Sequence, residues 1–333
     1  MRASSAMDRR VFIALMGDIL AAPVAARAQQ LRKLYRIGYL ASGPTLDARL
    51  QRALEDGLRE LGYVRGRQYS IEYRFSSGGD DTLRQLAEEL VQVPVDVIIA
   101  DTNPAVAAAR QATGTIPIVM AAPANPVGAG LVQSVARPGG NVTGLTVDPA
   151  PQTIIGKQLA VLKECAPKLS RVAALWNPAA PIYREYLDIL TTSARQLSIA
   201  VQSIEVRSAT TFERAFDRAR QLRSDGIIVL IDTVTFIHRK ELADLAREYR
   251  LPSVAYVREF AEAGGLVAYG ADLAVLFRRA AYYVDRIFKG AKPADLPIEQ
   301  PTTFLLVINQ QTAKALGLTV PSSLLIQAQH VIE

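Results

Sequence analysis

Short apolar segments alternate with amphipathic helical segments along most of this chain, and this alternation limits the possible folds more than any other sequence feature. The first half carries predicted strands at 35–40, 70–74, 95–100 and 116–120. Between them lie predicted helices at 45–61, 80–91 and 104–112. Alternation of strand and helix is typical of parallel sheets that are covered by helices on both faces.

The pattern begins again after a predicted loop at 137–144. Further strands are predicted at 172–176, 201–206, 226–230, 253–255 and 266–269. The predicted helices of this half span 152–165, 183–197, 212–222 and 236–249. The chain is longer than a single hydrophobic core usually organises, so two such runs predict an α/β protein with two doubly wound parallel-sheet lobes.

The remaining tail is too short for a third lobe. It contains a predicted helix at 273–288, a proline-rich passage, and a final strand and helix around 304–316. We expect this tail to cross back between the lobes and to make the hinge multi-stranded. The N-terminal lobe is then 34–145 with roughly 270–298, and the C-terminal lobe is 146–269 with roughly 299–333.

The first 28 residues have the three parts of a secretory signal peptide. Arg9 and Arg10 precede an apolar run that is shorter than the about 20 residues needed to span a bilayer. Cleavage after Ala28 predicts a periplasmic mature chain. Arg9 and Arg10 also resemble a twin-arginine signal, Asp18 interrupts the apolar run, and Met7 is an alternative start. The export route and the true start therefore stay open.

Charge and cysteine content exclude several classes of protein. Removing the signal takes away four arginines and two aspartates, so the formal net charge falls from +6 to +4. The remaining basic residues are scattered among acidic neighbours, unlike a nucleic-acid-binding face. The single cysteine, Cys165, excludes an intramolecular disulfide and lies in a helical pattern that predicts a buried side chain. The residue directly after the predicted cleavage site is Gln29 and not a cysteine, so we expect no lipid attachment there.

Small polar residues recur in the loops that follow the predicted strands. In open parallel sheets, ligands bind beyond the carboxyl ends of the strands, where such loops meet helix N-termini. Each loop holds small residues and a Ser, Thr, Asn or Asp that suits a helix cap, and most hold a proline. The loops are 41–45, 101–104, 121–126, 177–181 and 232–235. Together they predict a cleft for a small molecule between the lobes.

Carboxylates and aromatic residues are the candidate contacts within this cleft. Asp101 and Asp232 each end an apolar strand, where a carboxylate either holds a ligand ammonium group or caps the next turn. Asn177 lies in the matching loop after the strand at 172–176. Aromatic walls are offered by Tyr183, Tyr256, Phe260 and Tyr269, with core packing as the alternative. Trp176 and Phe260 fit the core better.

The sequence contains no recognisable catalytic or metal-binding motif. The two histidines, His238 and His330, have no partner at a known spacing. The sequence also lacks a G-x-G-x-x-G turn, a phosphate-binding loop, a G-x-S-x-G elbow and a Cys/His cluster. We therefore expect neither an enzyme nor a bound cofactor.

Four segments resemble a known protein family. They are ALEDGLRELGY at 53–63, ARPGGNVTG at 136–144, REFAEAGGL at 258–266 and AKALGLTVP at 313–321. In this order they are similar to the ABC-transporter substrate-binding proteins of the family that includes tryptophan- and tyrosine-binding members. The resemblance covers essentially all of the mature chain. It implies a type I periplasmic-binding-protein fold, with two α/β lobes, a three-stranded hinge and a ligand held between the lobes.

The resemblance also implies which residues line the cleft. The family's cleft loops fall on Ser42, Gly43, Thr102, Asn103, Ala105, Asn125, Pro126, Asp232 and Thr233, with a further wall from Tyr256. Two positions depart from the family's pattern. Asp101 stands where a small residue is usual, and Asn125 stands where Asp is frequent. An aromatic amino acid therefore does not follow as the ligand.

These observations predict a periplasmic solute receptor that closes on a small molecule, such as an amino acid or a related organic compound. The expected partners are that ligand and the permease subunits of an ABC importer in the inner membrane. We expect a monomer and no nucleic-acid partner. A periplasmic sensor that docks on a receptor and an exported α/β enzyme are the alternatives that the sequence leaves open.

Overall fold

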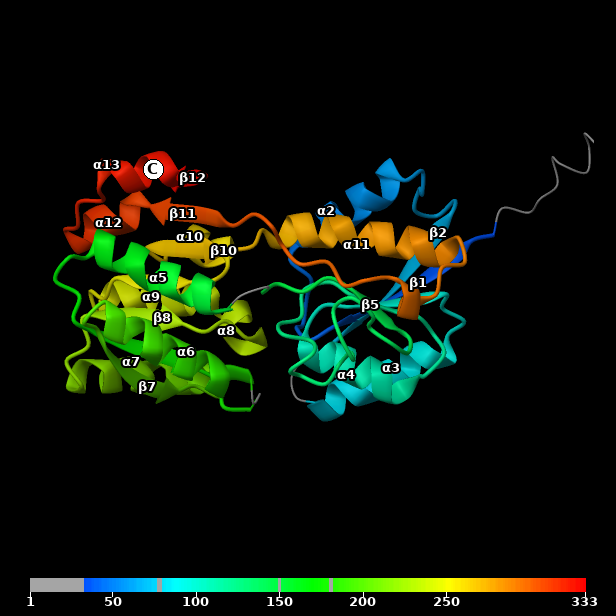
Figure 1. Cartoon of the computed structure of the whole chain (residues 1–333), viewed down its shortest axis with the longest axis horizontal. Helices are drawn as coiled ribbons and strands as arrows, with labels where there is room; N and C mark the ends of the chain where they lie inside the picture. Colours follow the sequence, from blue (N-terminus) through cyan, green and yellow to red (C-terminus); the bar gives the residue numbers. More distant parts are fainter. Residues whose placement is uncertain (1–32, 77–79, 149–150, 180–181) are drawn as a thin grey trace, which may run out of the picture.

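Two sheets form two lobes that lie side by side (Figure 1). The computed structural model describes residues 33–76, 80–148, 151–179 and 182–333, so the predicted signal peptide lies outside the described residues. The first sheet is parallel throughout and has the order β2-β1-β3-β4-β5. Its strands are β1 (Tyr35–Ala41), β2 (Tyr69–Phe75), β3 (Val97–Ala100), β4 (Ile118–Met120) and β5 (Val142–Gly144). We call this half the five-stranded lobe.

The second sheet has the order β7-β6-β8-β9-β10-β11-β12 and defines the seven-stranded lobe. Its strands are β6 (Arg171–Trp176), β7 (Ala200–Glu205), β8 (Gly226–Val229), β9 (Ser253–Ala255), β10 (Val267–Gly270), β11 (Leu305–Asn309) and β12 (His330–Ile332). The sheet is parallel except at β11 of the tail, which runs antiparallel to β10. The reason is topological: the chain leaves this lobe after β10 and re-enters it at the same end of the sheet.

Helices cover both faces of each sheet, as the alternation predicted. The helices of the five-stranded lobe are α2 (Ala48–Glu60), α3 (Asp80–Gln92), α4 (Asn103–Ala112) and α11 (Leu273–Phe288). The seven-stranded lobe carries α5 (Pro151–Cys165), α6 (Ile182–Gln196), α7 (Phe212–Gln221), α8 (Thr233–Ile237), α9 (Arg239–Glu248), α10 (Arg258–Glu262), α12 (Gln310–Leu316) and α13 (Ser322–Gln327). Short 3-10 turns occur at Ala209–Thr211 and Pro293–Asp295.

Three sequence predictions of elements are corrected. The single helix expected at 236–249 is two helices, α8 and α9, separated at His238. The expected loop at 137–144 contains β5. The tail adds α13 and β12 beyond the expected final helix.

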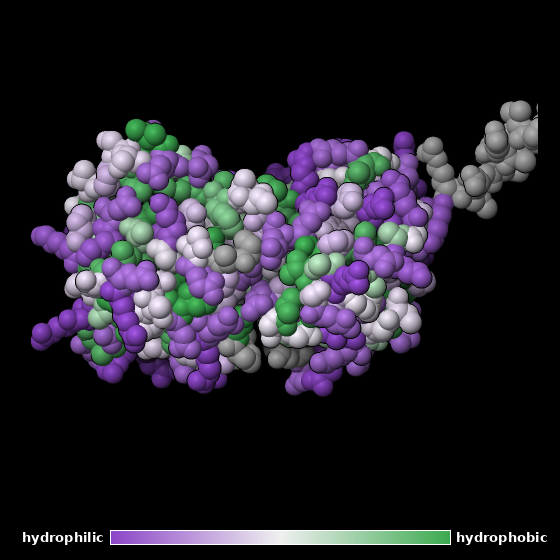
Figure 2. All heavy atoms as spheres, in the orientation of Figure 1, coloured by the Kyte–Doolittle hydropathy of each residue, from purple (hydrophilic) through white to green (hydrophobic). Residues whose placement is uncertain are grey.

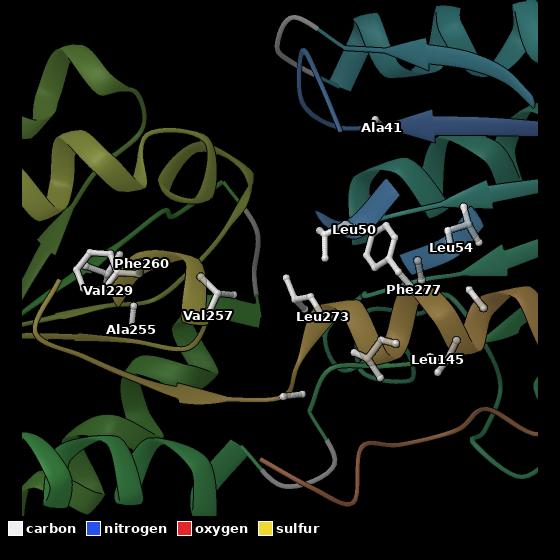
Figure 3. Packing of buried hydrophobic residues seen from close by; sticks show 14 of the residues in the cluster. Ala41, Leu50, Leu54, Leu145, Val229, Ala255, Val257, Phe260, Leu273 and Phe277 are labelled. Atoms are coloured by element: carbon white, nitrogen blue, oxygen red, sulfur yellow. The ribbon is translucent and has the colours of Figure 1, made fainter. Parts of the chain in front are cut away.

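The packing of α11 on α2 explains why a late segment of the chain belongs to the five-stranded lobe. Leu50, Leu54 and Leu58 lie one turn apart on α2 and are at most 3% exposed. Figure 3 shows Leu273 and Phe277 of α11 beside Leu50 and Leu54. The backbones approach so closely that a Cβ atom at Gly57 would lie 2.4 Å from the carbonyl oxygen of Arg278.

The chain passes between the sheets along three described segments, at 145–148, 270–272 and 296–304. Two of these segments pair with each other, because Thr146 N donates to Glu299 O at 3.0 Å and Glu299 N donates to Gly144 O at 3.0 Å. In the remaining segment, 270–272, Asp272 caps α11 and also accepts a hydrogen bond from Arg49 at 2.9 Å. The hinge is therefore multi-stranded.

The visible surface mixes polar and apolar residues over both lobes (Figure 2). Within the described ranges, no helix combines the length and the apolar character required of a membrane span. Cys165 is buried, with 1% of its surface exposed, which confirms the prediction for this side chain.

Candidate functional site

The same winding in both sheets places one switch point in each lobe. Strands β2-β1-β3 and β7-β6-β8 have matching order, so the chain turns to opposite sides of the sheet after β1 and β3, and again after β6 and β8. Ligands of open α/β sheets bind at the carboxyl ends of the strands beside such a point. The loops that follow these four strands are therefore the candidate ligand-binding loops.

In the five-stranded lobe, Asp101 joins the loops after β1 and β3. Its Oδ1 accepts a hydrogen bond from Ser42 N at 3.2 Å. The hydroxyls of Ser42 and Thr102 also hydrogen-bond to each other. Burial raises the pKa of Asp101 to about 6, against hydrogen bonds from Ser42 and Thr102 that lower it. The sequence-predicted residues Ser42, Asp101 and Thr102 thus form one cluster.

In the seven-stranded lobe, Asp232 joins the loops after β6 and β8 in the same way. Asn177 Nδ2 donates to Asp232 Oδ2 at 2.5 Å. The other oxygen caps α8, because it accepts from Thr235 N at 2.8 Å and from Thr235 Oγ1 at 2.7 Å. Both carboxylate oxygens are therefore engaged, and capping is one role of Asp232. Thr233 is the first residue of α8.

Asn125 organises the loop after β4, and its backbone has a φ of +38°, in the left-handed region. Its N–H donates to Asp148 Oδ1 at 2.8 Å, and its Oδ1 accepts from Gly128 N at 2.9 Å. Asn103 fixes the same loop, since its side chain pairs with the N–H and the carbonyl of Ala124, both at 2.7 Å. Pro126 and Ala105 are buried, and Ala105 lies in the hydrophobic core of this lobe.

Two tyrosines reach from the seven-stranded lobe toward the hinge. The hydroxyl of Tyr183 donates to Ile231 O at 2.8 Å, and the hydroxyl of Tyr256 donates to Val147 O. Burial raises the pKa of both hydroxyls far above the usual range, so both stay protonated. Tyr269 lies in β10, and its ring centroid is 6.1 Å from that of Phe304 in the hinge.

Trp176 and Phe260 belong to the core, as predicted. Trp176 is 4% exposed and donates from Nε1 to Ser203 Oγ at 2.8 Å. Phe260 is fully buried. Neither ring is available as an open wall of the cleft.

The lobes touch each other through several of these loops. Asn125 Nδ2 donates to Glu185 Oε2 of α6 at 3.5 Å. A Cβ atom at Gly43 would lie 3.2 Å from Ile237 Cδ1 of α8, so the loop after β1 faces the opposite lobe. Ion pairs join Asp47 to Arg239 at 3.0 Å and Arg49 to Glu259 at 2.6 Å.

A groove of about 380 Å³ lies between the lobes beside these ion pairs. It is lined by Asp47, Arg49, Ile237, Arg239, Lys240, Glu259, Glu262 and Ala263. None of the sequence-predicted site residues lines this groove. The strand-end loops and the groove are therefore separate parts of the junction between the lobes.

Sequence reasoning missed Asp148 and Glu185. Asp148 is 8% exposed and holds the Asn125 loop to the hinge. The signal that selected Asp101 and Asp232, a carboxylate after an apolar strand, also exists at Asp148. It is weak there because Thr143, Gly144 and Thr146 interrupt the apolar run.

The described part of the chain contains no cluster of three or more His, Cys, Asp and Glu side chains that is suited to a metal ion. The chemistry on offer at the strand ends is hydrogen bonding. Carboxylates, amides and hydroxyls occupy the strand-end loops of each lobe, and the lobes meet near them through Asn125 and Glu185. Such polar groups are typical of sites for small polar molecules.

Comparisons with known proteins agree with this geometry. The sequence model of a family described as ABC transporter substrate binding protein matches residues 37–332. A tyrosine-binding protein from Clostridioides difficile strain R20291 is 27% identical over 282 residues, which cover 85% of this chain and 80% of that protein.

Solved structures also resemble this chain over most of its length. The crystal structure of a conserved domain protein from Vibrio cholerae has a TM-score of 0.83 and 26% identity, and the match covers 90% of this chain and 100% of that chain. An ABC domain from Streptococcus pneumoniae in complex with L-Trp has a TM-score of 0.82 and 27% identity, with the same coverage of 90% and 100%.

Proposed function

This chain belongs to the family of ABC transporter substrate-binding proteins, and we propose that it is the periplasmic solute-binding component of an ABC importer. Its fold is that of type I periplasmic binding proteins. Members of the family bind substrates and are not enzymes. In the proposed role, the protein holds a small molecule between its lobes, and a permease in the inner membrane receives it.

The observation that carries this proposal is the matched pair of polar clusters at the two switch points. Ser42 with Asp101 in one lobe corresponds to Asn177 with Asp232 in the other. A molecule held by both clusters makes contacts to two lobes at once, and such contacts exist only when the lobes are closed. Ligand binding therefore favours closure.

The proposed binding residues are those of the strand-end loops and the tyrosines near the hinge. They are Ser42, Gly43, Asp101, Thr102, Asn103, Ala105, Asn125, Pro126, Asn177, Asp232, Thr233, Tyr256 and Tyr269. The proposed lobes are 34–145 with roughly 270–298, and 146–269 with roughly 299–333. We propose that the exported protein acts as a monomer, after cleavage behind Ala28.

An amino acid or a related organic compound is the proposed class of ligand. Support comes from the relative that is named for tyrosine binding and from the similar structure that contains L-Trp. The departures at Asp101 and Asn125 concern the polar part of the cleft, so the side-chain preference of this protein is a separate question.

The proposal is tested by ligand binding to the purified mature protein. Trp176 is the only tryptophan of the chain and precedes Asn177 of the switch-point cluster, so its fluorescence reports on that loop. A panel of amino acids and organic acids is added, with melting temperature and X-ray scattering as further measurements. A true ligand at a hundred times its Kd stabilises the folded state by about 2.7 kcal/mol and compacts the protein.

Two variants and a control locate the site. Asp101→Ala and Asp232→Ala weaken ligand binding if these loops contact the ligand, whereas Asp81→Ala serves as a control because this carboxylate on α3 is 96% exposed. If no compound of the panel stabilises or compacts the protein, the proposed transport role is contradicted. If a ligand binds equally to all three variants, the placement of the site is wrong.

A further inference from the structure

Asp148 is a buried carboxylate of which only one oxygen has a partner. It lies on the first segment that joins the lobes and is 8% exposed. Oδ1 accepts hydrogen bonds from Asn125 N at 2.8 Å and from Thr146 Oγ1 at 3.2 Å. Oδ2 is buried and has no hydrogen-bond partner among the described residues. A buried acceptor without a donor is costly, so such an atom in a native fold calls for an explanation.

The side chains around Asp148 do not supply the missing donor. Tyr183, Tyr256 and Glu185, all from the seven-stranded lobe, lie close enough to interact electrostatically with it. Each tyrosine hydroxyl has one proton, and each already donates it to a backbone carbonyl, of Ile231 or of Val147. Glu185 is an acceptor. None of these three groups therefore has a free proton to donate to Oδ2.

The charges near Asp148 also indicate that a partner is missing. Burial raises the pKa of Asp148 to about 6, the hydrogen bonds from Asn125 and Thr146 lower it, and Glu185 raises it further. None of the groups that shift this pKa is a lysine or an arginine. The carboxylate is thus largely ionised at neutral pH without a protein cation beside it, and a buried charge of this kind is normally paired.

The other carboxylates of the site are less free to accept a ligand. Asp232 uses one oxygen for Asn177 and the other for the cap of α8. Asp101 accepts from Ser42 N and is hydrogen-bonded to Thr102. Asp148 is distinguished by an oxygen that is buried and has no hydrogen-bond partner among the described residues.

We propose that Asp148 binds the protonated amino group of the ligand through Oδ2, with Glu185 adding negative charge from the opposite lobe. This inference rests on the proposed function, because it assumes that a small molecule binds between the lobes. It adds that the molecule carries an ammonium group. Since Asp148 lies on the hinge and also holds the Asn125 loop through Oδ1, the contact joins the ligand to the segment about which the lobes move.

The test compares probes that lack either the amino group or the carboxylate of an amino acid. L-tyrosine and L-tryptophan carry an amine and a carboxylate, tyramine and tryptamine carry the amine alone, and 3-(4-hydroxyphenyl)propionate and indole-3-propionate carry the carboxylate alone. Each probe is titrated by calorimetry against the wild type, Asp148→Asn, Asp148→Glu and the control Asp81→Asn.

The proposal predicts that the wild type binds an amine-containing probe, and that Asp148→Asn weakens this binding roughly 10- to 100-fold, the range for a hydrogen bond to a charged group. Asp148→Glu retains part of the affinity. Asp81→Asn binds as the wild type does, because this carboxylate is 96% exposed. Asp148→Asn without ligand melts at a higher temperature than the wild type, because a buried unpaired charge is gone. If Asp148 served only to hold the Asn125 loop in place, Asp148→Asn would instead melt at a lower temperature than the wild type.

A second measurement follows the binding of an amine probe as a function of pH. Because the pKa of Asp148 is about 6, the apparent affinity of the wild type for an amine probe falls about tenfold between pH 7 and pH 5. In Asp148→Asn this part of the pH dependence is absent. The pKa of Asp101 is also about 6, so its contribution to the pH dependence is distinguished from that of Asp148 by repeating the titration with Asp101→Asn.

Several outcomes overturn the inference while the proposed function stands. One is equal affinity of the wild type and folded Asp148→Asn for an amine probe. A second is binding of the deaminated probes as tightly as the amino acids, and a third is an affinity for amine probes that does not change between pH 5 and pH 7. If the wild type binds no probe of this set or of the wider panel, both the inference and the proposed function fail.

Discussion

Asp101 illustrates how one partly buried side chain changes the response of the whole protein to pH. Its carboxyl pKa is raised from 3.8 to about 6, mainly by burial. A raised pKa means that the folded state binds the proton more tightly than the unfolded state does. The resulting stabilisation is fully present below pH 4 and is lost as the pH rises through about 6.

Replacement of Asp101 by Asn removes this cost of ionisation. We expect Asp101→Asn to increase the free energy of unfolding at pH 7 by at most about 3 kcal/mol, since one pKa unit corresponds to about 1.4 kcal/mol and partial exposure reduces the effect. The gain shrinks at pH 5. Urea unfolding of both proteins at the two pH values measures it, and a gain that is the same at both values contradicts the assignment.

Residues at strand ends could be predicted from sequence, whereas residues on the hinge could not. Asp101, Asn177 and Asp232 follow apolar strands, so the geometry of parallel sheets alone brings each of them to the carboxyl edge of its own sheet. The position of Asp148 depends on Asn125 and on residues of the opposite lobe, which are distant in sequence. Only the folded structure shows that one of its oxygens lacks a partner.

At the scale of elements, the close contact of α2 with α11 depends on Gly57. A Cβ atom there would lie 2.4 Å from the Arg278 carbonyl oxygen and 2.9 Å from Ala281 Cβ. Gly57→Ala is expected to separate the two helices and to cost about 1–3 kcal/mol, as overpacking does. Denaturant unfolding measures the loss.

Gly156 of α5 provides a matched control. The nearest atom to a Cβ at this position is Ser193 Oγ, at 3.8 Å, so there is room for a methyl group. Gly156→Ala is expected to stabilise the protein by roughly 0.5–1 kcal/mol, through helix propensity alone. Equal effects of the two substitutions would show that the helix contact does not depend on Gly57.

Strong periodicity predicted the long elements, and the short ones were missed. Helices such as α2 and α11 carry apolar residues at every turn, so their existence follows from the pattern. Strand β5 has only three residues, and one of them is Gly144, a residue typical of loops, with a φ of +126°. The break at His238 was missed because the apolar pattern runs through it without Gly or Pro. The start of α8 was also missed: Asp232 caps the helix, so α8 begins at Thr233, three residues before the expected start at Phe236.

At the scale of the whole molecule, ion pairs between the lobes affect the balance between open and closed arrangements. Asp47 and Arg239 belong to different lobes, and their side chains are 20% and 25% exposed. Arg239→Gln is expected to increase the radius of gyration of the ligand-free protein in X-ray scattering. A partly exposed pair is worth up to about 1 kcal/mol, so ligand affinity falls by at most about fivefold.

Arg220→Gln is the control, because Arg220 pairs with Asp217 within one lobe at 2.9 Å. It is expected to change neither the radius of gyration nor the affinity. Raising the salt concentration to about 1 M, where the Debye length is about 3 Å, makes the wild type resemble Arg239→Gln. If both variants scatter like the wild type at low salt, the ion pair does not hold the lobes together.

The three passages between the lobes also determine the order in which the protein can be completed. The apolar face of α2 is covered by α11, which is synthesised after strands β6 to β10 of the other lobe. A nascent chain therefore leaves Leu50 and Leu54 uncovered until most of both lobes has been made. The five-stranded lobe therefore gains α11 only after five strands of the other lobe have been synthesised.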